Sequence, residues 1–182
     1  MSPIKITQSI LSPAAAQKKV LSVPSVDQMQ SEWCWAACSA MVLSYYGNLD
    51  VNKCDFVNWL FSQTKCCNDS NSNDCNKNCQ WSDIVKIYSH WKIKCTKKED
   101  NVSFSTIVSE INLGRPVEIG YNWLFGGGHV VLAIGYDASV LDRKYLYLND
   151  PSRGHGWYLY DDVLNAGDKG SWVYTWTGIV EL

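Results

Sequence analysis

Residues 28–47 read QMQSEWCWAACSAMVLSYYG, and this stretch decides the fold. Apolar residues recur at helical spacing over 32–46, and Gly47 supplies a stop signal, so the stretch predicts one helix. Cys34 stands at the start of that helix, where unpaired backbone N–H groups and the helix dipole favour a thiolate. The position predicts an activated sulfur. As an equal alternative, Cys34 and Cys38 are ordinary buried cysteines or disulfide partners.

Two tryptophans, Trp33 and Trp35, flank Cys34. Apolar walls around a nucleophile strengthen an ion pair with a neighbouring imidazolium, because they exclude water. Gln28 lies six residues before the cysteine, and an amide donor there could meet a developing oxyanion beside the backbone N–H of Cys34. On the residues alone, Gln30 is an equal candidate for this role.

A cysteine nucleophile needs a base, and the chain contains three histidines. His129 follows three consecutive glycines and opens the apolar run VVLAIGY, which predicts an imidazole held on a rigid strand beside room for a substrate backbone. His90 falls on the surface of a predicted helix, and His155 lies between two glycines in a predicted loop. We therefore expect His129 to be the base, with a structural histidine at a strand entrance as the alternative.

The next predicted strand, KYLYLND at 144–150, brings a carboxyl group to His129. If a turn at 137–143 joins two antiparallel strands, His129 and Asp150 lie across from one another with both side chains on one face. A carboxylate there can orient the imidazole. A register shifted by one residue would present Asn149 instead, which can also hold an imidazole, and Asp before Pro is in addition a common turn opener.

Along the rest of the chain, helices come first and strands afterwards. This order predicts an α+β fold in which a helical lobe packs against an antiparallel β-sheet lobe. Residues 1–24 are expected to form an extended N-terminal segment, and residues 25–182 a single domain. Helical patterns cover 54–61, 81–91 and 104–112, and β-rich segments cover 117–123, 129–136, 144–149, 156–160 and 172–180.

Composition places the chain among globular proteins. Of its 182 residues 46% are hydrophobic and 19% charged, which excludes wholesale disorder and fibrous repeats. The formal net charge of -2 gives no dominant positive field, and no segment reaches membrane-spanning length, so we expect neither a nucleic-acid partner nor a membrane span. Nine Trp, ten Tyr and eight Cys suit an extracellular or exported protein better than a cytosolic one.

Six of the eight cysteines lie in a polar insert at about 54–95. Covalent closure would compensate for the missing local core, so we expect three disulfides among these six. The adjacent Cys66 and Cys67 are expected to bond outward, and Cys38 to stay unpaired. A zinc cluster is the weaker rival, and no metal is expected. The six cysteines are Cys54, Cys66, Cys67, Cys75, Cys79 and Cys95.

The N-terminus, MSPIKITQSILSPAAAQKK, lacks the continuous apolar run that follows the basic start of a secretory signal. If the disulfides form, three routes to an oxidising compartment stay open. The first is a secretory signal that has been removed, the second is a secretion machine that needs no such signal, and the third is export as a piece of a larger toxin.

Gln28, the WCWAACSAMV helix, GGGHVVLAIGYD and YLYLNDPSRG, in that order, resemble the papain-like cysteine peptidase superfamily. Within it, the chain is most similar to the compact bacterial branch that includes plant-pathogen effector proteases and the peptidase domains of bacteriocin exporters. The resemblance covers about residues 24–153. Its most specific part is a Gln that is followed, after five intervening residues, by Cys-Trp. It implies a papain-like fold with the active site between the two lobes.

The resemblance also implies a role for each site residue. Gln28 matches the oxyanion-hole amide, Cys34 the nucleophile, His129 the base and Asp150 the group that orients the base. His129 follows Cys34 by 95 residues, against roughly 130 to 150 in papain and cathepsins, which implies a trimmed fold. The third member is Asp rather than Asn, and the cysteine-rich insert has no counterpart, which leaves the choice of substrate open.

The expected function is a cysteine endopeptidase that hydrolyses peptide bonds in a protein or peptide substrate without a cofactor. The resemblance further suggests an exported bacterial effector or toxin domain that acts as a monomer. Two alternatives stay open at this point. One is a deamidase or transglutaminase-like toxin acting on Gln side chains, and the other is a non-catalytic module that binds peptide or glycan.

Overall fold

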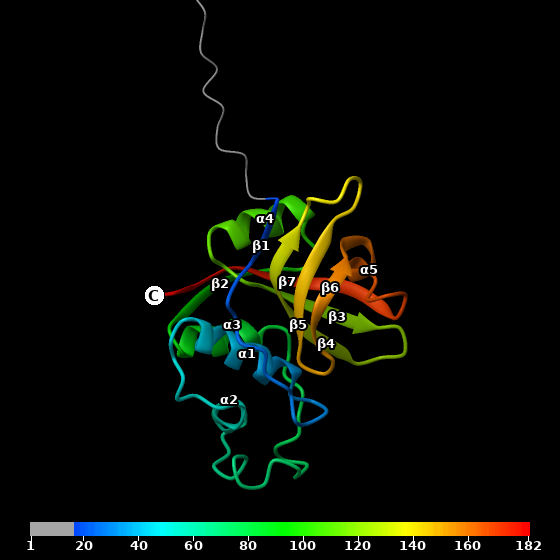
Figure 1. Ribbon diagram of the computed structural model, residues 1–182. Coiled ribbons are helices and arrows are strands. Elements are labelled where there is room, and N and C mark those ends of the chain that lie inside the picture. The colour runs from blue at the N-terminus through cyan, green and yellow to red at the C-terminus, as the bar shows by residue number, and fades with distance from the viewer. Residues whose placement is uncertain (1–16) are drawn as a thin grey trace, which may run out of the picture.

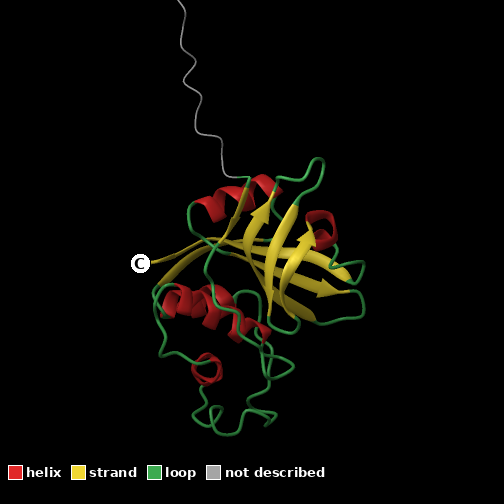
Figure 2. Cartoon of the chain, in the orientation of Figure 1, coloured by secondary structure: helices red, strands yellow, loops and turns green. Residues whose placement is uncertain are grey.

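A computed structural model of the chain describes residues 17–182 (Figure 1). Its strands form one seven-stranded antiparallel sheet in the order β2-β7-β3-β4-β5-β6, with β1 paired to β4 off this path. Helices α1, α2 and α3 gather on one side of the sheet, and α4 lies at its opposite end (Figures 1 and 2). The predicted α+β fold, a helical lobe against an antiparallel sheet, is confirmed. The helices are α1 (Cys34–Tyr45), α2 (Lys53–Phe61), α3 (Asp83–His90), α4 (Phe104–Asn112) and α5 (Tyr160–Leu164), and the strands are β1 (Lys18–Val20), β2 (Ile93–Lys98), β3 (Val117–Trp123), β4 (Gly128–Asp137), β5 (Tyr145–Asp150), β6 (Gly154–Leu159) and β7 (Gly170–Glu181).

Helix α1 is buried on all sides, since every residue from Trp35 to Leu43 is inaccessible to solvent. The sequence permits this because residues 36–40, AACSA, are small and let neighbouring elements approach closely. The hydroxyl of Ser39 donates to the backbone carbonyl of Trp35 at 2.9 Å, so this buried polar group is satisfied. The helix therefore packs as part of the core, and its first residue, Cys34, lies at the edge of that core.

Strand β4 runs through the sheet and is buried along the nine residues that follow Gly128. One edge of β4 pairs with β5. The other edge pairs with β3 as far as Ala133 and with β1 from Gly135 onward. An apolar run such as VVLAIGY is typical of a strand covered on both faces. Strand β4 thus gives His129, its second residue, a rigid support.

The β4–β5 hairpin has its turn where the sequence predicts it, but its register differs from the expectation. Leu132 pairs with Asn149. Continuing this register puts Asp150 across from Val131 rather than across from His129, so the predicted cross-strand pair is wrong. Side chains alternate between the faces of a sheet with a period of two. A shift of two residues therefore keeps His129 and Asp150 on one face, as predicted.

Every expected helix and strand is present, with ends within two residues of the expected ones. Three short elements escaped the sequence analysis, namely β1, β2 and α5. Strand β2, IKCTKK, carries lysines at exposed positions and therefore reads as polar, and α5 has only five residues. Of the expected N-terminal segment, residues 1–16 lie outside the described residues, while Leu21 and Val23 are buried. None of the helices in 17–182 has the length and hydropathy needed to cross a bilayer.

The cysteine-rich insert contains two disulfides, Cys54–Cys67 and Cys66–Cys75. The adjacent Cys66 and Cys67 bond outward, which confirms that expectation. Cys38 is free and buried, also as predicted.

The expectation of three disulfides is wrong for this structure, because Cys79 and Cys95 are free thiols. Cys95 belongs to strand β2, which pairs with β7. Cys79 lies in the loop before α3 and lines a cavity together with Cys34. Burial raises the pKa of Cys79 well above its ordinary value and that of Cys95 to about 12, so both stay protonated at neutral pH.

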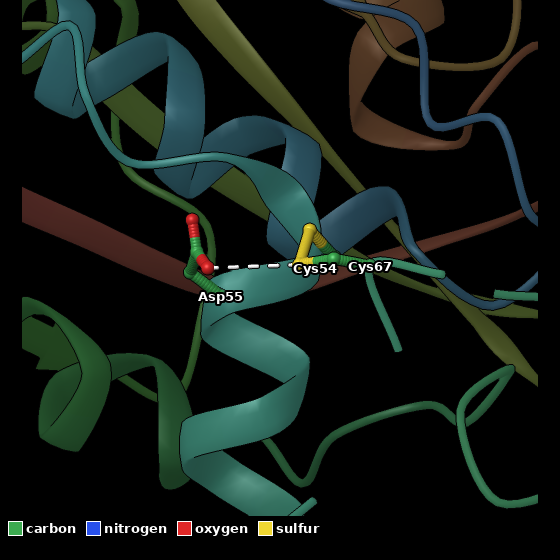
Figure 3. A group of neighbouring side chains, drawn as sticks. All are labelled: Cys54, Asp55 and Cys67. Atoms are coloured by element: carbon green, nitrogen blue, oxygen red, sulfur yellow. Dashed lines mark hydrogen bonds between the residues drawn. A yellow bond between two sulfur atoms is a disulfide. The ribbon is translucent and has the colours of Figure 1, made fainter. Parts of the chain in front are cut away.

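Asp55 lies beside the Cys54–Cys67 disulfide (Figure 3). Its Oδ1 is 3.6 Å from the sulfur of Cys67, and its Oδ2 accepts the backbone N–H of Asn52 at 2.8 Å as part of the cap of α2. Among residues 17–182, Cys54, Asp55 and Cys67 are the one group with the composition and proximity of a metal site. The two sulfurs are bonded to each other and carry no thiolate charge, so the bridged form offers a single carboxylate.

Hydrogen bonds fasten the insert to the start of α1. The indole N–H of Trp33 donates to the backbone carbonyl of Cys75 at 2.8 Å, and that of Trp35 donates to the carbonyl of Lys77 at 3.1 Å. Because Cys75 is itself tied to Cys66, the disulfide holds the acceptor in place for the tryptophan beside Cys34. The insert is therefore built into the surroundings of Cys34.

We expect the variant Cys66→Ala/Cys75→Ala to lose about 2 to 4 kcal/mol of the free energy of unfolding. The bridge closes a loop and both of its sulfurs are fully buried. Urea denaturation followed by tryptophan fluorescence measures the loss. The matched control is Cys54→Ala/Cys67→Ala, which removes a less buried bridge and should lose less. An unchanged unfolding midpoint for the first variant would contradict the structural role given to this bridge.

Candidate active site

The candidate nucleophile, Cys34, is the first residue of α1 and is partly buried. The first turn of the helix holds no acidic side chain, and no side chain caps it. Within residues 17–182 the backbone N–H of Cys34 has no acceptor. Free N–H groups at a helix N-terminus stabilise negative charge, whether on a sulfur or on an oxyanion next to it.

His129 lies between Cys34 and Asp150. Its Nε2 is 2.8 Å from Oδ1 of Asp150, and the two side chains are only 10% and 13% exposed. The Asp150 oxygen also accepts the backbone N–H and the hydroxyl of Ser152, both at 2.9 Å. With Nε2 engaged, Nδ1 is the ring nitrogen left to face the Cys34 side chain, which lines the same cavity and helps to raise the pKa of His129. The structure thus brings three of the predicted site residues together.

The pKa values of His129 and Asp150 are shifted in opposite directions. Burial alone would lower the pKa of His129, but hydrogen bonds to Asp150 and Cys34 and their charges outweigh burial and raise it to about 9. For Asp150, burial acts to raise the pKa, and the hydrogen bond and charge of His129 outweigh it and lower the pKa below its ordinary value. A protonated ring beside an ionised carboxylate is therefore the favoured state at neutral pH.

Trp123, which the sequence analysis did not single out, covers the imidazole. The two rings are stacked, with centroids 5.7 Å apart and planes 20° from parallel. Trp123 stacks in turn on Tyr121, the residue that pairs with His129 across the β3–β4 ladder. An indole over the ring limits its rotation and excludes water from the His129–Asp150 contact. The β3–β4 hairpin pattern, with its Gly-rich turn, was the signal that could have found it.

The structure separates the two candidate glutamines. The side-chain amide of Gln28 donates to the backbone carbonyls of Gln30 and Ser31, both at 2.9 Å, while its Oε1 is buried without a partner within residues 17–182. Its backbone N–H donates to Pro151 at 2.9 Å, which ties it to the turn after Asp150. The side chain of Gln30 instead donates to Ser70 in the insert. Gln28 is thus near the site, but both of its amide protons are engaged.

Asn149, the alternative to Asp150, has a different contact. It is buried, and its side-chain amide donates to the carbonyls of Val23 and Pro24, each at 3.3 Å. Asn149 therefore fastens the N-terminal segment to the sheet, and Asp150 is the residue that contacts His129.

The other two histidines lie elsewhere. His90 ends helix α3 and stacks on Trp59, with ring centroids 4.4 Å apart. His155 is exposed on strand β6, opposite Asn149. Neither lines a cavity together with Cys34.

Two cavities flank His129. The Cys34 cavity, of about 190 Å³, lies beside the sulfur, and the Asp150 cavity, of about 220 Å³, lies on the other side of the imidazole. The first is bounded by Ser31, Glu32, Cys34, Trp35, Asn78, Cys79, Gln80, Trp81, Ile84, Asn122, Gly127, Gly128, His129 and Val130. The second is bounded by Tyr121, Trp123, His129, Val131, Leu148, Asp150, Arg153, Tyr158, Asp162, Val163, Ala166, Gly167 and Lys169.

A buried carboxyl group, Glu118, was also missed by the sequence analysis. It lies on β3, and Tyr88 donates a hydrogen bond to its Oε2 at 2.7 Å. Burial raises its pKa to about 8, and the bond from Tyr88 offsets only part of that rise. The sequence does not reveal that Glu118 is buried, because a single Glu within the apolar run of β3 is equally compatible with an exposed face of the strand.

The model of the Peptidase_C39 like family matches residues 20–178. The peptidase domain of Streptococcus ComA, a bi-functional ABC transporter involved in a quorum sensing pathway, is 13% identical, and the match covers 85% of this chain and 98% of that chain with a TM-score of 0.53. Xylellain, a cysteine protease from Xylella fastidiosa, is also 13% identical, with 93% and 87% coverage and a TM-score of 0.52. No curated protein sequence matches the chain. The two structures share its fold.

We expect the free energy of unfolding to fall as pH rises, in two stages. The folded protein holds a proton on Glu118 between about pH 4.5 and 8, and on His129 between about pH 6.5 and 9, where the unfolded chain does not. Stability from His129 is therefore complete below pH 6.5 and lost as pH rises through 9. Each stage should amount to roughly 3 to 5 kcal/mol, because one pKa unit corresponds to about 1.4 kcal/mol.

Urea denaturation of the wild type, Glu118→Gln and His129→Ala between pH 4.5 and 9.5 separates the two stages. Glu118→Gln should flatten the acidic part of the profile, and His129→Ala the alkaline part. If His129→Ala keeps the wild-type slope above pH 6.5, the raised proton affinity of the His129–Asp150 pair is refuted.

Proposed function

The chain belongs to the Peptidase_C39 like family and is a papain-like cysteine protease, and we propose that Cys34, His129 and Asp150 form its catalytic triad. The observation that carries the proposal is His129, whose Nε2 lies 2.8 Å from Oδ1 of Asp150 and which lines one cavity together with Cys34. This is the arrangement in which one imidazole serves as base and a carboxylate fixes its orientation. The substrate class is a protein or peptide, cleaved at a peptide bond.

His129 is the proton acceptor for the Cys34 thiol, and the proton that the ring holds at neutral pH is the one that the sulfur has given up. The sulfur attacks the carbonyl carbon, and the free backbone N–H of Cys34 stabilises the oxyanion. The imidazolium then protonates the leaving amine, and a water molecule activated by the same ring releases the acyl group from the sulfur. Asp150 stays ionised and holds the ring throughout.

Gln28 is proposed as the second donor to the oxyanion. Its amide lies in the loop that leads into α1 and donates to the carbonyls of Gln30 and Ser31. The role requires one of these two bonds to yield to the substrate oxygen when the oxyanion forms. A charged oxygen is the stronger acceptor, so this exchange is favourable in the transition state.

We further propose that the protein is exported and works as a monomeric effector or toxin domain spanning residues 25–182. The two disulfides support this, since structural disulfides persist in oxidising compartments. The insert that carries them belongs to the same packed unit as the active site, because Trp33 and Trp35 hydrogen-bond to it.

We expect Cys34→Ala and His129→Ala each to reduce peptide hydrolysis by at least about a thousandfold, and the double variant to lose little more. Asp150→Ala should lose less, and Asp150→Asn less again, because an amide oxygen can still hold the ring. Mass spectrometry of peptide products gives the readout, and it separates cleavage from deamidation, which leaves the chain intact. Near-normal turnover by folded Cys34→Ala would refute the thiol mechanism, and a severe loss in Asn149→Ala alone would move the third role to Asn149.

The oxyanion role of Gln28 makes a separate prediction. We expect Gln28→Ala to lower kcat by about 100- to 1,000-fold with little change in KM, because the lost bond exists only in the transition state. Gln30→Ala is the matched control, since its amide contacts Ser70 in the insert. An equal loss in both variants would show that Gln28 acts only by shaping the loop before Cys34.

A further inference from the structure

The Cys34 cavity is closed on one side by the cysteine-rich insert. Residues 78–81 of the insert face the start of α1 and the Gly127–Gly128 end of the β3–β4 hairpin across it. Its volume of about 190 Å³ is below the range of pockets that hold a whole small-molecule ligand, so it has room for one side chain of an extended peptide. Because Cys34 and His129 are part of its wall, that side chain lies next to the scissile bond.

Glu32 gives this cavity an unbalanced negative charge. Its backbone N–H donates to Asn76 of the insert at 3.1 Å, which fixes its position, and Ser31 is the hydrogen-bond donor to its carboxylate at 3.4 Å. Among residues 17–182 it forms no ion pair, and no Lys or Arg lines the cavity. His129, the one other charged group of the wall, is already paired with Asp150.

The cationic residue nearest to this wall in the sequence does not neutralise Glu32. Lys77 lies over the ring of Phe61, with its Nζ 5.5 Å from the ring centroid. A carboxylate without a counter-ion is free to pair with a cation that enters the cavity.

Two indoles give the cavity apolar walls. Trp81 lies so close to Gly128 that a Cβ added there would be 2.8 Å from its ring, and it stands 5.1 Å from the ring of Tyr174, which holds it in place. Trp35 forms part of the opposite wall. The aliphatic stem of Lys or Arg packs well on such faces, and their π-electrons attract the cation at its end.

We propose that the Cys34 cavity is a subsite for a Lys or Arg side chain of the substrate, with Glu32 as the carboxylate that recognises the charge. The inference rests on the proposed function, because it assigns a substrate preference to the same site. The two proposals can still be tested separately, because Glu32 can recognise a cationic side chain even in a protein that binds peptides without cleaving them.

The test uses capped hexaalanine amides that carry a single Lys or, as a neutral match, a single Gln at each position. For the wild type, kcat/KM should be at least about tenfold higher for Lys than for Gln at one position. Tryptophan fluorescence of Cys34→Ala should show a similar difference in affinity. Glu32→Gln should abolish both preferences, and Glu32→Lys should reverse them in favour of the Gln peptide. Glu181→Gln, which changes an exposed carboxylate at the end of β7, is the matched control and should keep them.

Three results separate the two proposals. Cleavage of the Lys and Gln peptides at equal rates overturns the cationic subsite and leaves the peptidase function intact. Binding to Cys34→Ala that favours Lys and depends on Glu32, without cleavage by the wild type, supports the subsite and overturns the proposed function. Neither cleavage nor charge-dependent binding overturns both.

Discussion

Burial of helix α1 on every side is the constraint on which the rest of the structure depends. From Trp35 to Leu43 no residue of the helix reaches solvent, so the helix cannot slide or rotate without opening the core. Its first residue, Cys34, is therefore held at a fixed point of the surface. Small residues at 36–40 make this possible, since a helix with bulky side chains on all faces would not come close enough to β4. The sulfur of Cys34, the proposed nucleophile, and the free N–H groups at the helix start are positioned mainly by this packing.

Strand β4 gives the second half of the proposed site a comparable rigidity. It is paired on both edges and buried along nine residues, and His129 lies at its start. The imidazole is then fixed by Asp150 on one nitrogen and by Trp123 over its face. Groups already oriented before the substrate arrives need no reorganisation during the reaction, which is where enzymes gain most of their electrostatic stabilisation. Cys34 of the proposed triad thus comes from the helical lobe, and His129 and Asp150 come from the sheet.

The insert compensates with covalent bonds for what it lacks in apolar residues, and it is part of the site rather than an appendage. The Cys66–Cys75 disulfide holds the residue whose carbonyl accepts the indole N–H of Trp33, and the carbonyl of Lys77, two residues further on, accepts that of Trp35. Residues 78–81 then form a wall of the Cys34 cavity. A segment without counterpart in the papain pattern therefore lines the proposed subsite, while the residues of the proposed triad lie outside it.

The sequence by itself determined nine of the twelve helices and strands among residues 17–182, the α+β class, and the placement of His129 and Asp150 on one face. These follow from local rules, since the period of apolar residues identifies helices and strands, and hairpin alternation places His129 and Asp150 on one face. Only the tertiary structure decided the register, in which Leu132 pairs with Asn149, because the centre of the turn and the irregularity between Ala133 and Gly135 set it together and neither has a signal in the pattern. It also decided that Cys79 and Cys95 stay free, that Trp123 covers His129, and that the amide of Gln28 faces two carbonyls. Each of these depends on distances between residues remote in the chain, and such distances exist only once all the elements have packed together.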